Sequence, residues 1–312
     1  MAHRRIGQER LRLEVGSERS WPLDELGQVI DWRPIAAALS GVYAAAKGEA
    51  AWPPLALFKA LLIAVWYDLS DVKLAEALDD RASFRRFCGL SRDEKTPERT
   101  AFVRFRRELV SRGLDRVLFD RVTAMLRAKA ITVKTGTIVD ATVIRSASER
   151  DGEARWSGHR SRRAIHGYKA HVGADVETAL VEAVAVTPGN VHDGRAGGSA
   201  LPEAPGEVYA DSAYRGECFG SAVRSRGGAP RIALTAMWGR PGDDTLTKLR
   251  RWNRGVQRVR CRIEKVFGVC KRSYGLHRMR WRGLAKATLQ VRLTAIAYNL
   301  KRGIRVNPPN AA

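Results

Sequence analysis

The sequence has few cysteines, and no two of them are spaced as zinc ligands usually are. The 312 residues include four cysteines, which are Cys88, Cys218, Cys261 and Cys270. None of these forms a Cys-x-x-Cys pair, so the sequence offers no structural zinc site. The pattern predicts reduced thiols in a cytoplasmic protein rather than a disulfide framework.

No segment has the composition of a signal peptide or of a membrane span. The N-terminal stretch MAHRRIGQERLRLEVG lacks the apolar core that signal peptides carry. The most apolar run, PPLALFKALLIAVWYDL at 53–69, is interrupted by Lys59 and is too short to cross a bilayer. We expect this run to form a buried helix, and we expect no membrane partner.

Acidic residues are scarce relative to basic ones. The chain has 55 Lys and Arg against 33 Asp and Glu, which gives a formal net charge of +22. Such an excess predicts a polyanionic partner, most often nucleic acid, with a generally basic surface as the alternative. The shortage is greatest near the C-terminus. From Thr245 onwards there are 18 Lys and Arg, and Glu264 is the only carboxylate side chain.

The first 130 residues have a helical pattern in two parts. Residues 1–50 predict a partly helical N-terminal arm. Residues 51–130 predict short helices joined by tight turns, with Ser70 or Asp71 suited to cap one helix and Gly89 suited to end another.

An arginine-rich helix closes this helical segment. Arg104 and Arg106 lie on it, within TPERTAFVRFRRELVSRGL. Short helices with a basic last helix are typical of a helix-turn-helix DNA-binding domain, although any small helical bundle has a similar pattern. We therefore expect residues 51–130 to bind DNA.

Residues 131–312 predict an α/β domain. Three β-rich segments come first, and a short helix, a strand, a helix, a strand and a long helix follow. This order predicts an RNase H-like core, with a mixed five-stranded sheet and flanking helices, after an all-α N-terminal domain. Residues 146–167 are polar and rich in Ser, Gly and Arg, which predicts a mobile loop that orders on DNA.

Two aspartates follow apolar strand segments of this domain. Asp140 follows TGTIV, and Asp211 follows GEVYA. The ends of strands in an open α/β sheet form its active crevice, although either side chain could instead cap a turn or helix. If these two carboxylates meet Glu264, they repel one another strongly, which is tolerable only with divalent cations or with raised carboxyl pKa values. Two Mg²⁺ ions held this way support phosphodiester chemistry. The alternative for Glu264 is a surface ion pair with Arg260 or Lys265.

The helix around Glu264 resembles the C-terminal signature of DDE transposases from bacterial insertion sequences. That signature is Tyr, two residues, Arg, three residues, Glu, six residues, Lys. Arg260, Glu264 and Lys271 stand at these spacings, and Gln257 replaces the Tyr. VDATVI and ADSAYRG resemble the first and second Asp motifs. TPGNVHDG and AYNLKR resemble insertion-sequence family five.

The resemblance implies an RNase H-like enzyme that binds the terminal inverted repeats of its element, cuts there and joins the 3′-OH ends to target DNA. Asp140, Asp211 and Glu264 would be the catalytic metal ligands, for two Mg²⁺ or Mn²⁺ ions. Apart from the resemblance, we expect GNVHDG to form a loop near the active site in which His192 or Asp193 supports the metal ligands, with hydrogen bonding within the loop as the alternative. The partner would be double-stranded DNA, and the enzyme would act as a homodimer or higher oligomer.

The residues expected to contact DNA come from the signature, from the basic strip HRMRWRG and from the arginine-rich helix. They are Arg260, Lys271, Arg272, Arg278, Arg280, Arg104 and Arg106.

Two other functions fit parts of the sequence. A non-catalytic helix-turn-helix protein, such as a repressor, would need only residues 1–130 and no metal. An RNase H-like nuclease would cut DNA without joining it. Formation of joined products distinguishes the transposase from that nuclease.

Overall fold

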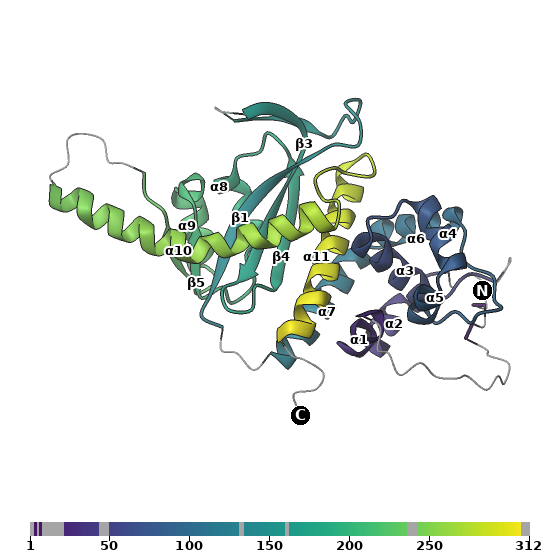
Figure 1. Cartoon of the computed structure of the whole chain (residues 1–312). Coiled ribbons are helices and arrows are strands. Elements are labelled where there is room, and N and C mark those ends of the chain that lie inside the picture. The colour runs from purple at the N-terminus through teal and green to yellow at the C-terminus, as the bar shows by residue number, and fades with distance from the viewer. Residues whose placement is uncertain are drawn as a thin grey trace. The chain divides into compact units, whose positions relative to one another are not determined.

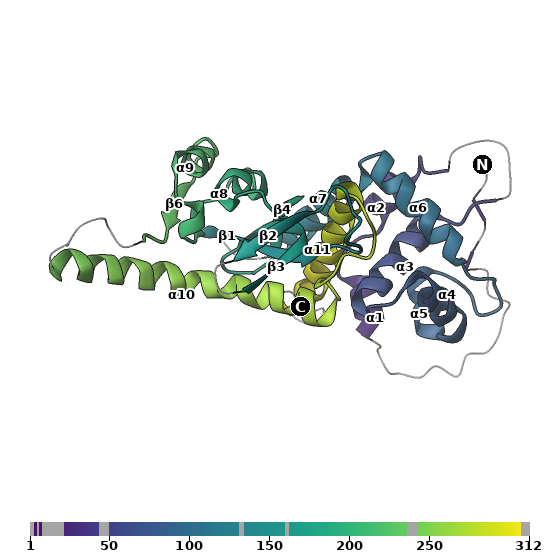
Figure 2. The same ribbon diagram turned by 90° about the horizontal axis from the view of Figure 1, so that it is seen from above.

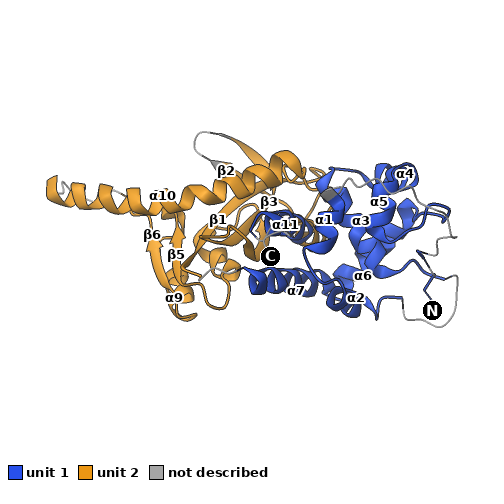
Figure 3. Cartoon of the chain, turned by 60° about the horizontal axis from the view of Figure 1, so that its bottom comes forward, with its two compact units in different colours: residues 1–130, 292–312 blue, residues 131–291 orange. Residues whose placement is uncertain are grey.

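The computed structural model describes residues 3–4, 6–7, 22–43, 50–130, 134–159, 162–235 and 243–306. The chain forms two compact units (Figure 3). Unit 1 comprises residues 1–130 and 292–312, and unit 2 comprises residues 131–291. Among the described residues, no helix is both long enough and apolar enough to cross a membrane.

Unit 1 is helical where it is described. Its helices are α1 (Pro22–Gln28), α2 (Arg33–Leu39), α3 (Pro54–Trp66), α4 (Asp71–Asp80), α5 (Ala82–Cys88), α6 (Arg99–Ser111) and α7 (Leu114–Lys129). The apolar run around Lys59 forms α3, whose side chains are almost all buried. Ser70 and Gly89 lie at helix ends, as predicted. The hydroxyl of Ser70 accepts a hydrogen bond from the Lys73 amide at the start of α4, and Gly89 ends α5 with a left-handed φ of 77°.

Unit 2 contains one sheet with flanking helices (Figure 1). Its strands are β1 (Gly136–Arg145), β2 (Arg155–His159), β3 (Arg162–Asp175), β4 (Val181–Pro188), β5 (Glu207–Ala210) and β6 (Ala229–Ile232). Its helices are α8 (Asp193–Ala196), α9 (Glu217–Arg224), α10 (Asp243–Ser273) and the first part of α11 (Leu284–Val306), with 3₁₀ turns η1 (Gly197–Ala200) and η2 (Ser212–Tyr214).

The sheet is mixed, as predicted for an RNase H-like core. The strand order is β2-β3-β1-β5-β6, and β4 also pairs with β3. Strand β3 pairs antiparallel with β1 and with β4. Strand β5 pairs parallel with β1 and with β6. Figure 2 shows α10 on one side of this sheet and α8 and α9 on the other.

The sheet has six strands rather than the predicted five. The extra strand is β2, which lies within the segment 146–167 that we expected to be a loop. It pairs antiparallel with β3, for example Trp156 with His166. Trp156 is 59% exposed, so β2 has little of the apolar alternation that marks a half-buried strand. Backbone hydrogen bonds with β3 form this strand. Its sequence lacks an alternation of buried and exposed residues, so apolar periodicity does not predict it.

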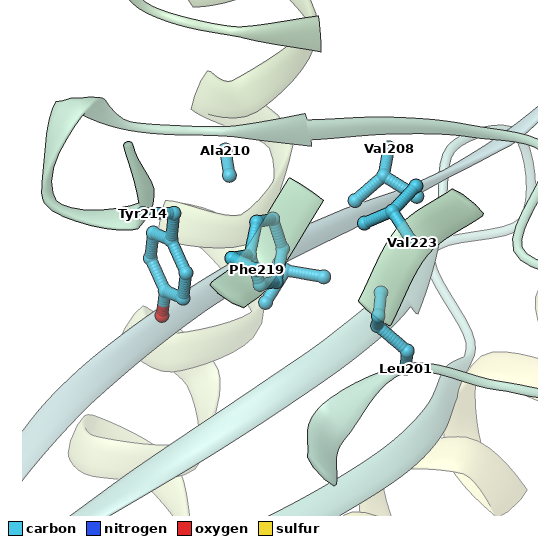
Figure 4. Packing of buried hydrophobic residues seen from close by; sticks show 7 residues of the cluster. Leu201, Val208, Ala210, Tyr214, Phe219 and Val223 are labelled. Atoms are coloured by element: carbon cyan, nitrogen blue, oxygen red, sulfur yellow. The ribbon is translucent and has the colours of Figure 1, made fainter. Parts of the chain in front are cut away.

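A buried cluster fixes the chain around the end of β5 (Figure 4). Its members are Val139, Leu201, Val208, Ala210, Tyr214, Phe219 and Val223. The rings of Tyr214 and Phe219 have centroids 4.9 Å apart. A Cβ atom on Gly197 would lie 2.4 Å from the Tyr214 ring, so glycine is needed for this close approach. The cluster thereby fixes η2 beside the last residue of β5.

Removing the largest apolar ring of this cluster should destabilise unit 2. Phe219 is 1% exposed, and its truncation to alanine leaves a cavity, so Phe219→Ala should lower the free energy of unfolding by roughly 3–5 kcal/mol. Chemical denaturation followed by circular dichroism measures the change. Leu234→Ala is the matched control, because Leu234 is 46% exposed and should change stability by less than about 0.5 kcal/mol. Equal effects of the two substitutions would contradict this packing.

Candidate active site

Asp140 lies within β1 rather than at its end. The stretch ITVKTGTIVDATVIR predicts a strand, and β1 indeed continues through Asp140 to Arg145 and pairs Asp140 with Val172 of β3. The stretch ATVIR after Asp140 is itself rich in β-branched residues, which explains the continuation. The Oδ1 atom of Asp140 accepts a hydrogen bond from the Ala141 amide at 2.8 Å.

Asp211 follows β5 directly, as predicted. Its Oδ1 atom accepts a hydrogen bond from the Ala213 amide at 2.8 Å, so it also caps η2. Strands β1 and β5 are parallel neighbours in which Ile138 pairs with Tyr209. Each aspartate comes two residues after its member of that pair, so the sheet register brings Asp140 and Asp211 to the same place.

Arg260 of α10 joins these two carboxylates. Its Nη2 atom lies 3.3 Å from Asp140 Oδ2 and 3.9 Å from Asp211 Oδ2. Its Nη1 atom donates to Gln257 Oε1 at 3.1 Å. The Arg260 side chain is only 13% exposed. One cationic nitrogen therefore faces a carboxylate oxygen from β1 and another from the turn that follows β5.

Glu264 lies on α10 one helical turn beyond Arg260. The spacings of Arg260, Glu264 and Lys271 place all three on one face of a helix with 3.6 residues per turn. Glu264 is exposed and has no hydrogen-bond or ion-pair partner among the described residues. In the part of the chain that is described, no three His, Cys, Asp or Glu side chains are grouped closely enough to hold a metal ion. The fold therefore brings two of the three predicted ligands together and leaves the third nearby.

The donor chemistry fits a hard divalent cation. Asp140 and Asp211 both direct an oxygen at one cationic atom, and carboxylate oxygens are the ligands that Mg²⁺ prefers. Burial raises the pKa of the Asp140 carboxyl to about 6, although the Arg260 guanidinium opposes the shift and Asp211 and Asp193 add to it. A buried carboxylate at this position is costly to ionise, and a nearby cation reduces that cost.

Two family matches cover most of the chain. Residues 131–300 match the transposase DDE domain, and residues 11–108 match a transposase domain called DUF772. The first match alone covers more than half of the chain. The chain belongs to the DDE transposases. This family comprises enzymes of DNA cleavage and strand transfer, and its members bind DNA, act in DNA transposition and typically use divalent metal ions. No solved structure was found to match the chain.

The loop after β4 contributes a second acidic group near Asp140. His192 caps α8, because its Nδ1 atom accepts a hydrogen bond from the Gly194 amide at 3.2 Å. Asp193 pairs with Lys169 of β3, with Oδ1 and Nζ 2.9 Å apart. Lys169 was missed by sequence reasoning, because a single lysine on a strand carries no signal of its partner.

His171 is a further buried group beside this transposase site. It lies opposite Ala141 in the β1–β3 register, and its Nε2 atom is 3.0 Å from Thr187 Oγ1. Burial lowers the pKa of His171 to about 4, although the Asp193 charge opposes the shift. Burial therefore favours the neutral imidazole, and His171 points to the opposite face of the sheet from Asp140 because successive residues of a strand alternate in direction.

The residues expected to contact DNA fall into two groups. Arg272, Arg278 and Arg104 are exposed. Lys271 is half-buried, and its Nζ atom donates to Val143 O of β1 at 3.1 Å. Arg280 is also half-buried. The exposed face of α10 carries further basic side chains, which are Lys248, Arg250, Arg251, Arg254, Arg258, Arg262 and Lys265.

Arg106 is a correction to the predicted DNA contacts. It is 7% exposed and forms a two-pronged pair with Asp71, at 2.7 Å and 2.6 Å. Its guanidinium therefore stabilises the helical unit, in place of the DNA contact that we expected. The sequence carried a signal of this, because Arg106 comes four residues after Phe102 and three before Leu109, on the buried stripe of α6.

Removing Arg106 should destabilise unit 1. Arg106→Ala leaves the Asp71 carboxylate partly buried without its partner, so the free energy of unfolding should fall by roughly 3–5 kcal/mol. Arg104→Ala is the matched control on the same helix, and it should change stability by less than about 0.5 kcal/mol. Thermal and chemical unfolding measure both variants. Wild-type stability in Arg106→Ala, with loss of DNA binding, would instead support the original prediction.

The buried Asp140 carboxyl should make stability fall as pH rises. Its folded-state pKa of about 6 exceeds the ordinary value of 3.8, so the folded protein binds more protons between those pH values and loses stability as the pH rises through them. Asp140→Asn has no charge to desolvate. It should match the wild type near pH 4 and exceed it above about pH 6.5, by at most about 3 kcal/mol.

Denaturation of wild type and Asp140→Asn in chelating buffer, from pH 4 to pH 8, measures this difference. A variant that is less stable than wild type at every pH would show that Asp140 is not desolvated in the folded protein.

Proposed function

We propose that this DDE transposase mobilises an insertion sequence of the family-five type. It binds the terminal inverted repeats of its element in the cytoplasm, cleaves the DNA there and joins the 3′-OH ends to target DNA. The observation that carries the proposal is the approach of Asp140 and Asp211 to one cationic nitrogen, with Glu264 on the same helix face as that cation.

Asp140, Asp211 and Glu264 would hold two Mg²⁺ or Mn²⁺ ions. When bound, such ions activate the attacking oxygen and stabilise the leaving oxygen of a phosphodiester. Strands β1 and β5 fix the two aspartates through their parallel pairing, and the turn capped by Asp211 holds its carboxylate in place. Glu264 would have to move toward the two aspartates to join them, because the three side chains are not grouped among the described residues.

Basic side chains of α10 would hold the DNA beside these carboxylates. Arg260 and Lys271 follow the family signature, the exposed Arg272 extends the basic surface of α10, and the exposed Arg278 lies in the segment after that helix. Arg280 lies in the same basic strip. His192 and Asp193 would support the site from α8, because the charge of Asp193 acts on Asp140.

The helices α4, α5 and α6 would form the helix-turn-helix-like DNA-binding domain within residues 51–130. The exposed Arg104 of α6 would contact a phosphate. Because two transposon ends must be processed together, we further propose that the enzyme acts as a homodimer or a higher oligomer.

A strand-transfer assay tests the proposal. Purified protein is mixed with labelled DNA from the ends that flank its gene and with an unlabelled plasmid, with and without Mg²⁺ or Mn²⁺. Asp211→Asn keeps an oxygen that can cap η2 but removes the charge, and it should lower cleavage and joining by at least about 100-fold while DNA binding persists.

Glu217→Gln is the control for this assay. Glu217 is an exposed acid on α9 that pairs with Arg224, so its loss should leave joining unchanged. Cleavage without joining in the wild type would support the nuclease instead. DNA binding without any metal-dependent reaction would support a regulator.

A further inference from the structure

We propose that Arg260 is a resident counterion of Asp140 and Asp211, and that a divalent cation must displace its guanidinium to reach both carboxylates. This inference rests on the proposed function, because it takes these two aspartates as metal ligands. It assigns Arg260 a role before DNA binds, in addition to any later contact with a phosphate.

The first support is the position of the guanidinium. A single atom, Nη2, lies 3.3 Å from Asp140 Oδ2 and 3.9 Å from Asp211 Oδ2. A cation shared by these oxygens would have to occupy the same region. A divalent ion and a guanidinium repel each other at such distances, so they compete for the two carboxylates.

The second support is that the Arg260 side chain is mostly buried and one of its nitrogen atoms lacks a hydrogen-bond partner among the described residues. The Arg260 side chain is 13% exposed, and its Nε atom is buried with no hydrogen-bond partner among the described residues. A buried donor without a partner is unfavourable, so the attraction of the carboxylates must hold the side chain there. An arginine held in this way can leave when a stronger cation neutralises both carboxylates.

The third support is Gln257, which stands where the transposase signature has Tyr. Its Oε1 atom accepts a hydrogen bond from Arg260 Nη1 at 3.1 Å. Residues three apart on a helix face one another, so this contact directs the guanidinium from its own helix. Gln257, which replaces the Tyr of the signature, thus positions the guanidinium of Arg260.

Mn²⁺ binding to the full chain without DNA tests the inference. Free Mn²⁺ is measured by electron paramagnetic resonance during titration of metal-stripped protein at pH 8. Arg260→Gln should bind Mn²⁺ about tenfold more tightly than the wild type, because the competing charge is gone. Arg262→Gln is the matched control. It loses the same charge two residues away, where the guanidinium contacts Val176 O and Glu177, and it should bind Mn²⁺ as the wild type does.

The inference is overturned if Arg260→Gln binds Mn²⁺ no more tightly than Arg262→Gln. Asp140→Asn separates this failure from a failure of the proposed function. If Asp140→Asn abolishes Mn²⁺ binding while Arg260→Gln leaves it unchanged, the metal site stands and the counterion role is wrong. If Asp140→Asn binds Mn²⁺ as tightly as the wild type, the metal site itself is wrong, and the counterion role fails with it.

A second variant keeps the test valid if Arg260→Gln does not fold. Gln257→Ala retains the arginine and removes only the acceptor of Nη1, so Mn²⁺ affinity should rise by a smaller factor, about two- to threefold. Thermal unfolding in chelator provides a readout independent of metal. Arg260→Gln should unfold at a lower temperature than Arg262→Gln, because it leaves the two carboxylates without a counterion. Unchanged Mn²⁺ affinity in Gln257→Ala would contradict the positioning role of the glutamine.

Discussion

The burial of the Asp140 carboxylate beside a second acidic group is the constraint from which the candidate site in unit 2 follows, because burial is the main cause of its raised pKa. Parallel pairing of β1 with β5 places Asp140 and Asp211 side by side, and the cluster around Tyr214 and Phe219 fixes the turn that carries Asp211. Two like charges held this close by a rigid sheet need a cation nearby. The long helix α10 supplies one, because Arg260 reaches both carboxylates from the face that also carries Glu264.

This arrangement explains why a strongly basic helix retains Glu264, its one acidic residue beyond the first turn. Most of the charge on α10 lies on its exposed face, where Lys and Arg suit a polyanion. Its apolar residues Val256, Ile263, Val266 and Cys270 are buried, and they fix the rotation of the helix against the sheet. That rotation turns Arg260 toward the aspartates. Under the proposed function the same residues take a catalytic role, and the approach of Asp140 and Asp211 to one guanidinium supports that role for these two carboxylates.

The parts of the fold that depend on apolar periodicity could be predicted from the sequence. The buried helix α3, the mixed sheet and the long helix α10 all follow from it. Strand β2 could not be predicted, because Trp156 and its neighbours are exposed and only backbone pairing forms the strand. Asp140 lies within β1 rather than at its end, because the β-branched residues after it continue the strand. The pairing of Arg106 with Asp71 was missed because charge was weighed more heavily than the buried stripe on α6.

The central claim is that segments around Asp140, Asp211 and Glu264 share one metal site. Iron-mediated backbone cleavage tests it most directly. Fe²⁺ takes the place of Mg²⁺ in the wild-type protein, and ascorbate with peroxide generates hydroxyl radicals that cut the chain close to the bound ion. The account predicts cuts near all three residues, suppressed by excess Mg²⁺ and lost in Asp140→Asn. Cuts at other positions, or cuts near Asp140 and Asp211 without any near Glu264, would contradict a site built from the three carboxylates.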